Sequence, residues 1–360
     1  MRHNIIKYFL RYLKLFLFHK LSHKNIPFSA QIEVTLSCKA HCNFCSIAQI
    51  PESLASKEMS TEQIKTIIKQ IADLGIPALS FTGGEPTLRE DLPDLIYYSG
   101  IRHQLITGLA TNGQNLPSLL ENNSLKGLDY ILISLDFPIS KLHDELRGMP
   151  LFEKAIKSIR LARAKGIKII ISTNVMKSNL KYLPRISELA QKLDCSLELF
   201  PCENLPFSTS EGTQYTPKKI NNLIPNLKLW AKAVRTLRSH FDNVLTNSYC
   251  IKLIEQGGFG GVQSQDKVLQ CHVAETYLFV RSDGMINFPC KIHPILSFNA
   301  LQIPLRQILY SKRVQEIRDK HDSFAFCKGC RLGCTITASM TARWGTLYEK
   351  YIKNVLKGNL

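Results

Sequence analysis

The sequence predicts an α/β fold in which strands and helices alternate to form a partial or full (β/α) barrel. Three observations predict it: short apolar runs recur between helical segments, these runs lack regular polar alternation, and turn residues separate them. Such runs are typical of parallel strands buried on both faces, and strands that alternate with helices build such barrels. The expected strands are 31–36, 78–82, 105–111, 130–135, 168–174 and 196–200.

Helices are expected between the strands, where apolar residues recur at helical spacing. Ser60 with Gln63 resembles a capping box, which opens a helix that runs through Leu74 and stops at Gly75. In a barrel of this kind, the chemistry lies on the loops that follow the carboxyl ends of the strands. The further helices are expected over 152–165, 180–193 and, with an amphipathic pattern, 218–243.

The chain has 360 residues and a formal net charge of +17. This length suffices for one large domain and a smaller one. The positive balance favours anionic partners such as phosphorylated metabolites, nucleic acid or an acidic membrane surface, and it also serves general solubility. The sequence has no RNA-binding module and no aromatic–basic recognition pattern, so nucleic acid is not an expected partner.

The N-terminus is basic and apolar, and residues 1–32 contain no Asp or Glu. Its apolar run of about 14 residues is too short to span a bilayer, and no cleavage site of a signal peptide follows it. Lys7, Arg11 and Lys14 fall on one face of a helix. The pattern predicts a basic amphipathic helix over 1–27 that contacts a membrane surface through residues 1–24. The alternative is a helix packed on this protein or on a second copy.

Eleven cysteines gather mainly at two places, which points to metal binding rather than to a disulfide framework. Cys38, Cys42 and Cys45 follow the first expected strand. Most 4Fe–4S clusters are bound by four cysteine thiolates, one for each iron. Three thiolates can bind three of the irons and leave the fourth without a protein ligand. A structural zinc site that uses His41 or a distant cysteine is the alternative.

A second motif, the turn Gly83, Gly84, Glu85 and Pro86, follows the second expected strand. The two motifs together resemble the signature of the radical S-adenosylmethionine (SAM) superfamily. The resemblance covers residues 30–202. It implies a partial (β/α)6 TIM-like barrel over 28–214. It also implies an oxidoreductase or transferase in which a cluster cleaves SAM to a 5′-deoxyadenosyl radical, which abstracts hydrogen from a substrate.

The resemblance also implies roles for single residues. Cys38, Cys42 and Cys45 would ligate the SAM-binding 4Fe–4S cluster, and the turn at 83–86 would hold the SAM amino group. Arg147, in a His-Asp-x-x-Arg-Gly segment, would pair with the SAM carboxylate. An external electron donor such as flavodoxin or ferredoxin would reduce the cluster. Further SAM-facing residues would be Ser134, Asp136 and Asn174, and no catalytic residue is assigned.

The second group of cysteines resembles the SPASM or twitch extensions of this superfamily, which carry auxiliary iron–sulfur clusters. It departs from them because five residues separate Gly284 from Cys290 and because the full seven-cysteine pattern is absent. One auxiliary 4Fe–4S cluster is therefore expected in a region over 265–360, after a helical linker over 215–264. A zinc site is the alternative. The candidate ligands are Cys271, Cys290, Cys327, Cys330 and Cys334.

The substrate is the least determined part of the prediction. The basic apolar N-terminus favours a membrane-associated lipid or isoprenoid, and a cytoplasmic protein at the inner face of the membrane. The auxiliary-cluster region and the segment around Arg147 favour the alternative, a peptide maturase. A zinc-binding interaction protein is the non-enzymatic alternative. Three isolated cysteines, Cys195, Cys202 and Cys250, are expected to be small buried hydrophobes.

Overall fold

The computed structural model describes residues 26–51, 58–208, 213–217, 220–259, 270–320 and 323–341, together with 13, 14, 16 and 17. Most of the amphipathic helix expected over 1–27 lies outside these residues, and so does the end of the chain after residue 341. Among the helices that are described, none is both long and apolar enough to cross a bilayer.

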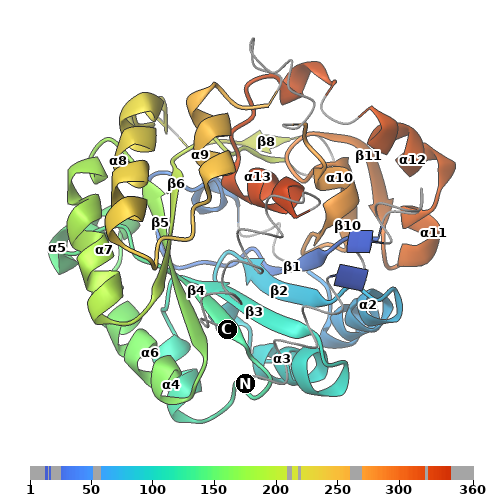
Figure 1. Cartoon of the computed structure of the whole chain (residues 1–360). Helices are drawn as coiled ribbons and strands as arrows, with labels where there is room; N and C mark the ends of the chain where they lie inside the picture. Colours follow the sequence, from blue (N-terminus) through green and yellow to red (C-terminus); the bar gives the residue numbers. More distant parts are fainter. Residues whose placement is uncertain are drawn as a thin grey trace.

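A nine-stranded sheet forms the centre of the described part of the chain (Figure 1). Its strands lie in the order β11-β10-β9-β1-β2-β3-β4-β5-β6. The strands from β9 through β1 to β6 are parallel, and β10 is antiparallel to both β9 and β11. The bounds are β1 (Ser29–Thr35), β2 (Ala78–Gly83), β3 (Ile106–Thr111), β4 (Tyr130–Ser134), β5 (Lys168–Val175), β6 (Ser196–Pro201), β9 (Tyr277–Val280), β10 (Met285–Pro289) and β11 (Pro294–Asn299), with a separate pair β7 (Phe207–Ser208) and β8 (Gln214–Tyr215).

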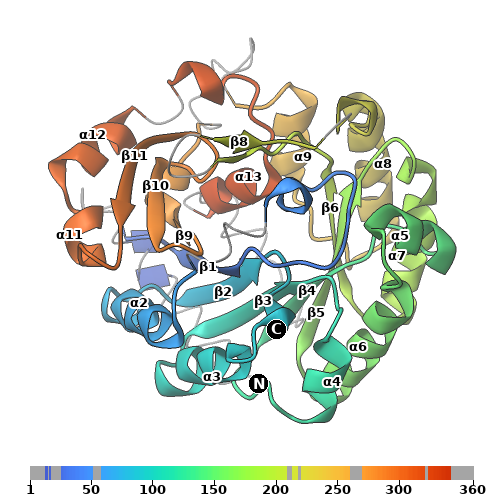
Figure 2. The ribbon, with the colours of Figure 1, turned by 180° about the vertical axis from the view of Figure 1, so that it is seen from behind.

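Helices join the parallel strands and lie around the outside of the curved sheet (Figure 2). The capping box at Ser60 and Gln63 is formed in both directions, and the helix that it opens ends at Asp73. The α/β architecture is the predicted partial, TIM-like barrel. The bounds are α2 (Thr61–Asp73), α3 (Leu92–Tyr97), α4 (Leu116–Glu121), α5 (Ser140–Arg147), α6 (Phe152–Ala164), α7 (Leu183–Lys192), α8 (Leu227–His240), α9 (Ser248–Glu255), α10 (Val273–Thr276), α11 (Leu305–Leu309), α12 (Lys312–Asp319) and α13 (Gly333–Met340).

The amphipathic helix expected over 218–243 is shorter in the structure. Residues Ile220–Asn222 form a separate short turn of helix, and α8 begins at Leu227. Pro225 disfavours helical geometry in the residue before it. The Asn226 side chain then accepts a hydrogen bond from the backbone N–H of Leu229, which caps the new helix.

The strands are not buried equally on both faces, which differs from the sequence prediction. Ile169, Ile171 and Thr173 of β5 are buried, whereas the intervening residues are half-buried or exposed. The same alternation runs along β4 and β6, whereas β1 is buried at four consecutive positions from Ile32 to Thr35. One face packs against the helices and forms the hydrophobic core, so the other face lines the inside of the barrel.

The C-terminal region continues the barrel sheet. β9 pairs with β1 in parallel, with Tyr277 opposite Ser29 and Val280 opposite Ile32. The loop after β9 also donates from Ser282 to the buried carboxylate of Glu33 on β1. The first cysteine group therefore follows β1, whereas in the second group Cys271 precedes β9 and Cys290 follows β10.

Candidate functional site

The first three cysteines lie on a loop that leaves the carboxyl end of β1. Cys42 is buried with Ala40 and Leu151, and Cys38, Phe44 and Cys45 pack against this small cluster. The pKa of the Cys38 thiol is raised to about 11, mainly by burial, with smaller contributions from Glu85 and from the nearby thiols of Cys42 and Cys45. Burial likewise raises the pKa of Cys42. The three sulfurs predicted from the spacing are therefore close enough to interact electrostatically.

The Gly-Gly-Glu-Pro turn is clamped against the start of this loop. The backbone N–H of Gly84 donates to Thr35 O over 2.7 Å, and that of Glu85 donates to Ser37 O over 2.8 Å. A Cβ atom on Gly84 would lie 2.4 Å from Ser37 O, so only glycine allows this approach. The turn thus fixes the backbone that leads into Cys38.

The Glu85 carboxylate is wholly buried and links this turn to β3. It accepts hydrogen bonds from the N–H and hydroxyl of Thr87, the hydroxyl of Thr111 and the N–H of Asn112, over 2.6–3.0 Å. Burial raises the pKa of Glu85, and the four donors oppose the rise. The Asn112 amide nitrogen lies 3.8 Å from Cys38 Sγ. The sequence prediction did not include Asn112.

A second network holds the loop from the other side. Asp136, at the end of β4, is 0 % exposed and forms an ion pair with Arg147, whose Nε and Nη2 lie 2.7 and 2.6 Å from Asp136 Oδ2. Asp136 Oδ1 accepts from the N–H of Asn174 over 2.9 Å, and the Asp136 N–H donates to His143 Nδ1 over 3.2 Å. The structure therefore brings together three of the predicted SAM-facing residues.

The segment around Arg147 also bonds directly to the cysteine loop. The carbonyl oxygen of Arg147 accepts from the N–H of His41 over 3.0 Å and from Cys42 Sγ over 3.8 Å. Gly148 adopts a φ of +65°, and a Cβ there would lie 3.1 Å from His41 Cβ. Asp144 accepts from the N–H groups of Leu151 and Phe152, which begin α6. The segment thus connects α5, α6 and the loop.

These residues fit an iron–sulfur cluster with a polar co-ligand. Two N–H donors, on Asn112 and Arg147, reach cysteine sulfurs, and such donors are typical around cluster thiolates. Thr82, Ser134 and Asn174 are half-buried polar residues near the carboxyl ends of three strands, where a barrel places its ligands. In the described residues, no group of three or more His, Cys, Asp or Glu side chains is arranged to hold one metal ion.

Four of the second group of cysteines line one cavity of about 430 Å³, namely Cys271, Cys290, Cys327 and Cys330. Burial raises the pKa of Cys271, and the nearby thiols of Cys330 and Cys290 raise it further. Cys334 lies in α13, but its side chain is outside the description. His293 also lines the cavity, with its ring stacked at 4.8 Å on Phe326. The sequence prediction did not include His293, which lies three residues after Cys290.

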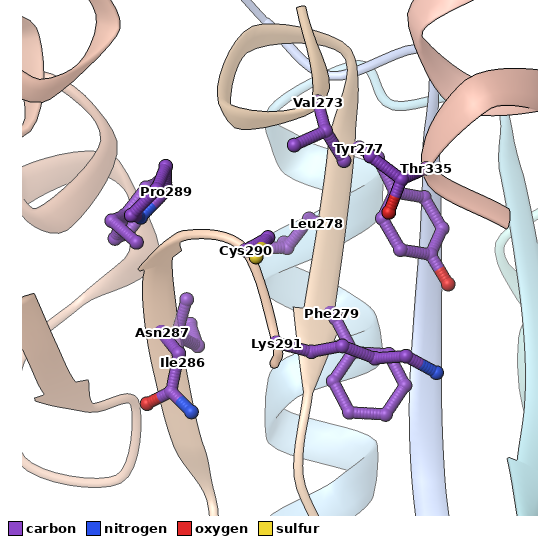
Figure 3. A pocket seen from close by; sticks show the side chains of 11 residues that line it. Val273, Tyr277, Leu278, Phe279, Ile286, Asn287, Pro289, Cys290, Lys291 and Thr335 are labelled. Atoms are coloured by element: carbon purple, nitrogen blue, oxygen red, sulfur yellow. The ribbon is translucent and has the colours of Figure 1, made fainter. Parts of the chain in front are cut away.

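A second cavity of about 380 Å³ adjoins the first, with Cys290 and Thr335 lining both. Figure 3 shows Lys291 extending across the ring of Phe279, beside Cys290. The Lys291 Nζ lies 4.6 Å from the ring centroid. Burial raises the pKa of Glu33 on β1, and Lys291 is one of the groups that oppose the rise. Residues of β9 and β10, together with Thr335 of α13, therefore form the walls of this cavity beside Cys290.

The isolated cysteines are buried as predicted. Cys195, Cys202 and Cys250 are 3 %, 1 % and 1 % exposed. Cys195 and Cys250 belong to the main hydrophobic core, and Cys202 to a smaller cluster near Phe137.

Two protein-family models match the chain. Residues 32–190 match the radical SAM superfamily, and residues 271–331 match an iron–sulfur cluster-binding domain of the SPASM type. The two matches contain all the cysteines of the first group and, within the second, those from Cys271 to Cys330.

Two relatives are similar over most of the chain. An AdoMet-dependent heme synthase of Methanosarcina barkeri is 28% identical over 85% of this chain and 89% of its own length. A PqqA peptide cyclase of Granulibacter bethesdensis is 26% identical over 69% of each chain. The crystal structure of Streptococcus suis SuiB bound to S-adenosylmethionine has a TM-score of 0.63 and 19% identity, and it covers 87% of this chain and 74% of SuiB. That likeness shows the shared fold.

Proposed function

The chain belongs to the radical SAM superfamily and carries a SPASM region, and from this premise we propose that it modifies a peptide. It is an enzyme that uses SAM and 4Fe–4S clusters. The chemistry that these cofactors supply when bound is reductive cleavage of SAM, followed by abstraction of a hydrogen atom from the substrate. The electron comes from an external donor.

The roles of single residues follow as part of this proposal. Cys38, Cys42 and Cys45 hold the SAM-binding cluster, and the turns at 83–85 and 111–113 keep that loop in place. The half-buried polar groups Ser134 and Asn174 face SAM. The second cluster is held by the cavity of Cys271, Cys290, Cys327 and Cys330.

The observation that favours a peptide substrate is the polarity of the inner barrel face. Gln31 donates to Ser80 over 3.1 Å and accepts from Tyr277 over 2.6 Å, which links β1, β2 and β9 across this face. Half-buried Ser172 and Glu198 add further polar groups on β5 and β6. A hydrocarbon chain against this face would exclude water from its half-buried polar side chains without offering a hydrogen bond in return, whereas peptide amides supply both donors and acceptors.

The position of the two cysteine groups supports the same substrate. The first group follows the carboxyl end of β1. In the second group, Cys271 precedes β9, the parallel neighbour of β1, and Cys290 follows β10, which runs antiparallel to β9. An extended peptide inside the barrel therefore contacts both ends. The relatives named as peptide cyclases align over about 70% of this chain. The lipid hypothesis depends on residues 1–24, most of which lie outside the described part of the chain.

The test follows deuterium from the substrate. Cells of the source organism grown in deuterated medium supply a peptide fraction and a lipid fraction, and each is mixed with reconstituted enzyme, SAM and a reductant without oxygen. We expect deuterium in 5′-deoxyadenosine, measured by mass spectrometry, with the peptide fraction only. The Cys38→Ala variant should abolish the signal and Cys195→Ala should keep it. Deuterium from the lipid fraction alone would overturn the proposal.

A heme-type tetrapyrrole is the second candidate. The relative named as a heme synthase aligns over 85% of this chain, more than the peptide cyclases do. Lys291 above the Phe279 ring also suits a flat ligand that carries carboxylates. A third reaction with a carboxylated iron porphyrin tests this candidate. Porphyrin consumption without deuterium transfer from peptides would favour it over the peptide.

A further inference from the structure

The guanidinium of Arg147 has a fixed position beside a cysteine that we assign to the SAM-binding cluster. Its Nε and Nη2 are both used by Asp136, and its remaining nitrogen, Nη1, lies 4.0 Å from Cys42 Sγ. The centre of the guanidinium also lies 5.1 Å from the centroid of the Phe44 ring. These contacts direct the third nitrogen of Arg147 at the sulfur.

The pair is buried, so its charges are weakly screened. Arg147 is 8 % exposed and Asp136 is 0 % exposed. Burial by itself would lower the pKa of Arg147, but Asp136 and the nearby Cys42 raise it above its ordinary value. The guanidinium therefore stays charged. At low dielectric, a fixed charge at this distance acts on a neighbouring redox centre far more strongly than it would in water.

The surroundings prevent the pair from moving away. Asn174 and His143 hold Asp136 through its carboxylate and its N–H, and Asn179 donates to its carbonyl oxygen over 3.0 Å. The carbonyl of Arg147 is bonded to the N–H of His41. Removing the two charges of an ion pair from water has a large unfavourable free energy. This one is held in place by hydrogen bonds at both of its residues.

We propose that Arg147 is a positioning residue that raises the reduction potential of the cluster through Cys42, and that Asp136 holds it there and partly offsets its charge. The proposal rests on the cluster assignment made above. Reduction adds negative charge to the cluster, so a nearby cation and an N–H donor to a ligand sulfur both favour the reduced form. The residue thereby sets how easily the external donor can start each turnover.

The test compares substitutions whose expected shifts have opposite signs. Arg147→Gln removes the positive charge, so the midpoint potential of the cluster should fall. Asp136→Asn keeps the shape of the side chain but removes the offsetting charge, so the potential should rise. Arg147→Lys keeps the charge and should lie between wild type and Arg147→Gln. Lys141→Gln removes the same charge from an exposed position on α5 and should change nothing.

The measurement is an anaerobic redox titration of the full chain followed by EPR, with the signal that changes on SAM addition identifying the N-terminal cluster. Iron content shows separately whether each variant holds its clusters. Shifts of the same sign in Arg147→Gln and Asp136→Asn would overturn the proposal. If Arg147→Gln holds no iron, Asp136→Asn and Arg147→Lys decide it, and wild-type potentials in both would overturn it. Absence of any SAM-sensitive cluster in the wild type would instead overturn the cluster assignment.

Discussion

His143 is a fully buried histidine whose two ring nitrogens differ in their surroundings. Nδ1 accepts from the N–H of Asp136, and Nε2 has no hydrogen-bond partner among the described residues. Burial lowers the pKa of His143 to about 4, from an ordinary value of about 6.5. The folded protein therefore binds the proton less readily than the unfolded chain does.

This difference predicts a loss of stability in acid. Because the folded-state pKa is the lower one, the contribution of His143 is complete above pH 6.5 and is lost as the pH falls toward 4. Between pH 7 and pH 5 we expect about 2 kcal/mol of the unfolding free energy to be lost through this residue. Urea unfolding of the apo chain at the two pH values measures it.

The controls separate His143 from the other groups that titrate in this range. His143→Gln keeps an acceptor for the Asp136 N–H but does not titrate, so its loss between pH 7 and pH 5 should be about 2 kcal/mol smaller. His240→Gln changes an exposed histidine at the end of α8 and should keep the wild-type loss. Equal losses in His143→Gln and wild type would contradict the assignment.

At the residue scale, contacts between site residues could be predicted only where those residues lie close together in the sequence. Cys38, Cys42 and Cys45 stand within eight residues, so their spacing indicates a shared ligand. Asn112 meets Cys38 only because β3 lies two strands from β1 in the sheet. No local pattern marks such a contact. Arg147 was predicted from its segment, but its pairing with Asp136 follows from the fold of α5 onto β4.

At the scale of elements, the strands of the barrel were predicted to within two residues and the C-terminal strands were not predicted. β2 to β6 are separated by helices of regular length, which makes their period visible. β9 has only four residues and follows a short helical turn, so the sequence carries little signal for it. Its place beside β1 depends on pairing between residues almost 250 positions apart.

The helices that flank this region are tied together by one buried arginine. Arg318 of α12 is 1 % exposed and donates from Nε to Ala274 O over 3.1 Å and from Nη1 to Leu309 O over 2.9 Å. These carbonyls lie in the last turns of α10 and α11, where no further backbone N–H of the helix reaches them. The guanidinium thus joins three elements.

Removing this arginine should therefore loosen the C-terminal region. Arg318→Met keeps most of the side-chain volume but leaves two buried carbonyls without their donors, and we expect a loss of about 2 kcal/mol or more in unfolding free energy. Urea unfolding followed by circular dichroism measures it. Lys312→Met removes the same charge from an exposed position on α12 and should cost less than about 0.5 kcal/mol. Equal stability in the two variants would show that the carbonyl contacts add nothing.

At the scale of the whole molecule, one sheet carries both cysteine groups. β1 leads directly into the first group. In the second group, Cys271 precedes α10 and β9, Cys290 follows β10, and Cys327 and Cys330 follow α12. Because β9 runs parallel to β1 and β10 runs antiparallel to β9, Cys271 and Cys290 lie toward the amino end of β9, whereas the first group lies beyond the carboxyl end of β1. The first group packs against Ala40 and Leu151, and the second lines a cavity with Phe259 and His293, so each group has its own protein surroundings.

Separate surroundings predict that the two clusters load independently. The reconstituted wild type should bind about eight irons per chain, and Cys38→Ala/Cys42→Ala/Cys45→Ala and Cys271→Ala/Cys290→Ala should each bind about four. Only the second variant should keep an EPR signal that changes when SAM is added, because only it retains the open iron site. Cys195→Ala, outside both groups, should match the wild type. Zinc at the second group, found by elemental analysis after anaerobic purification, would assign that cavity to a structural metal instead, since tetrahedral thiolate sites suit zinc.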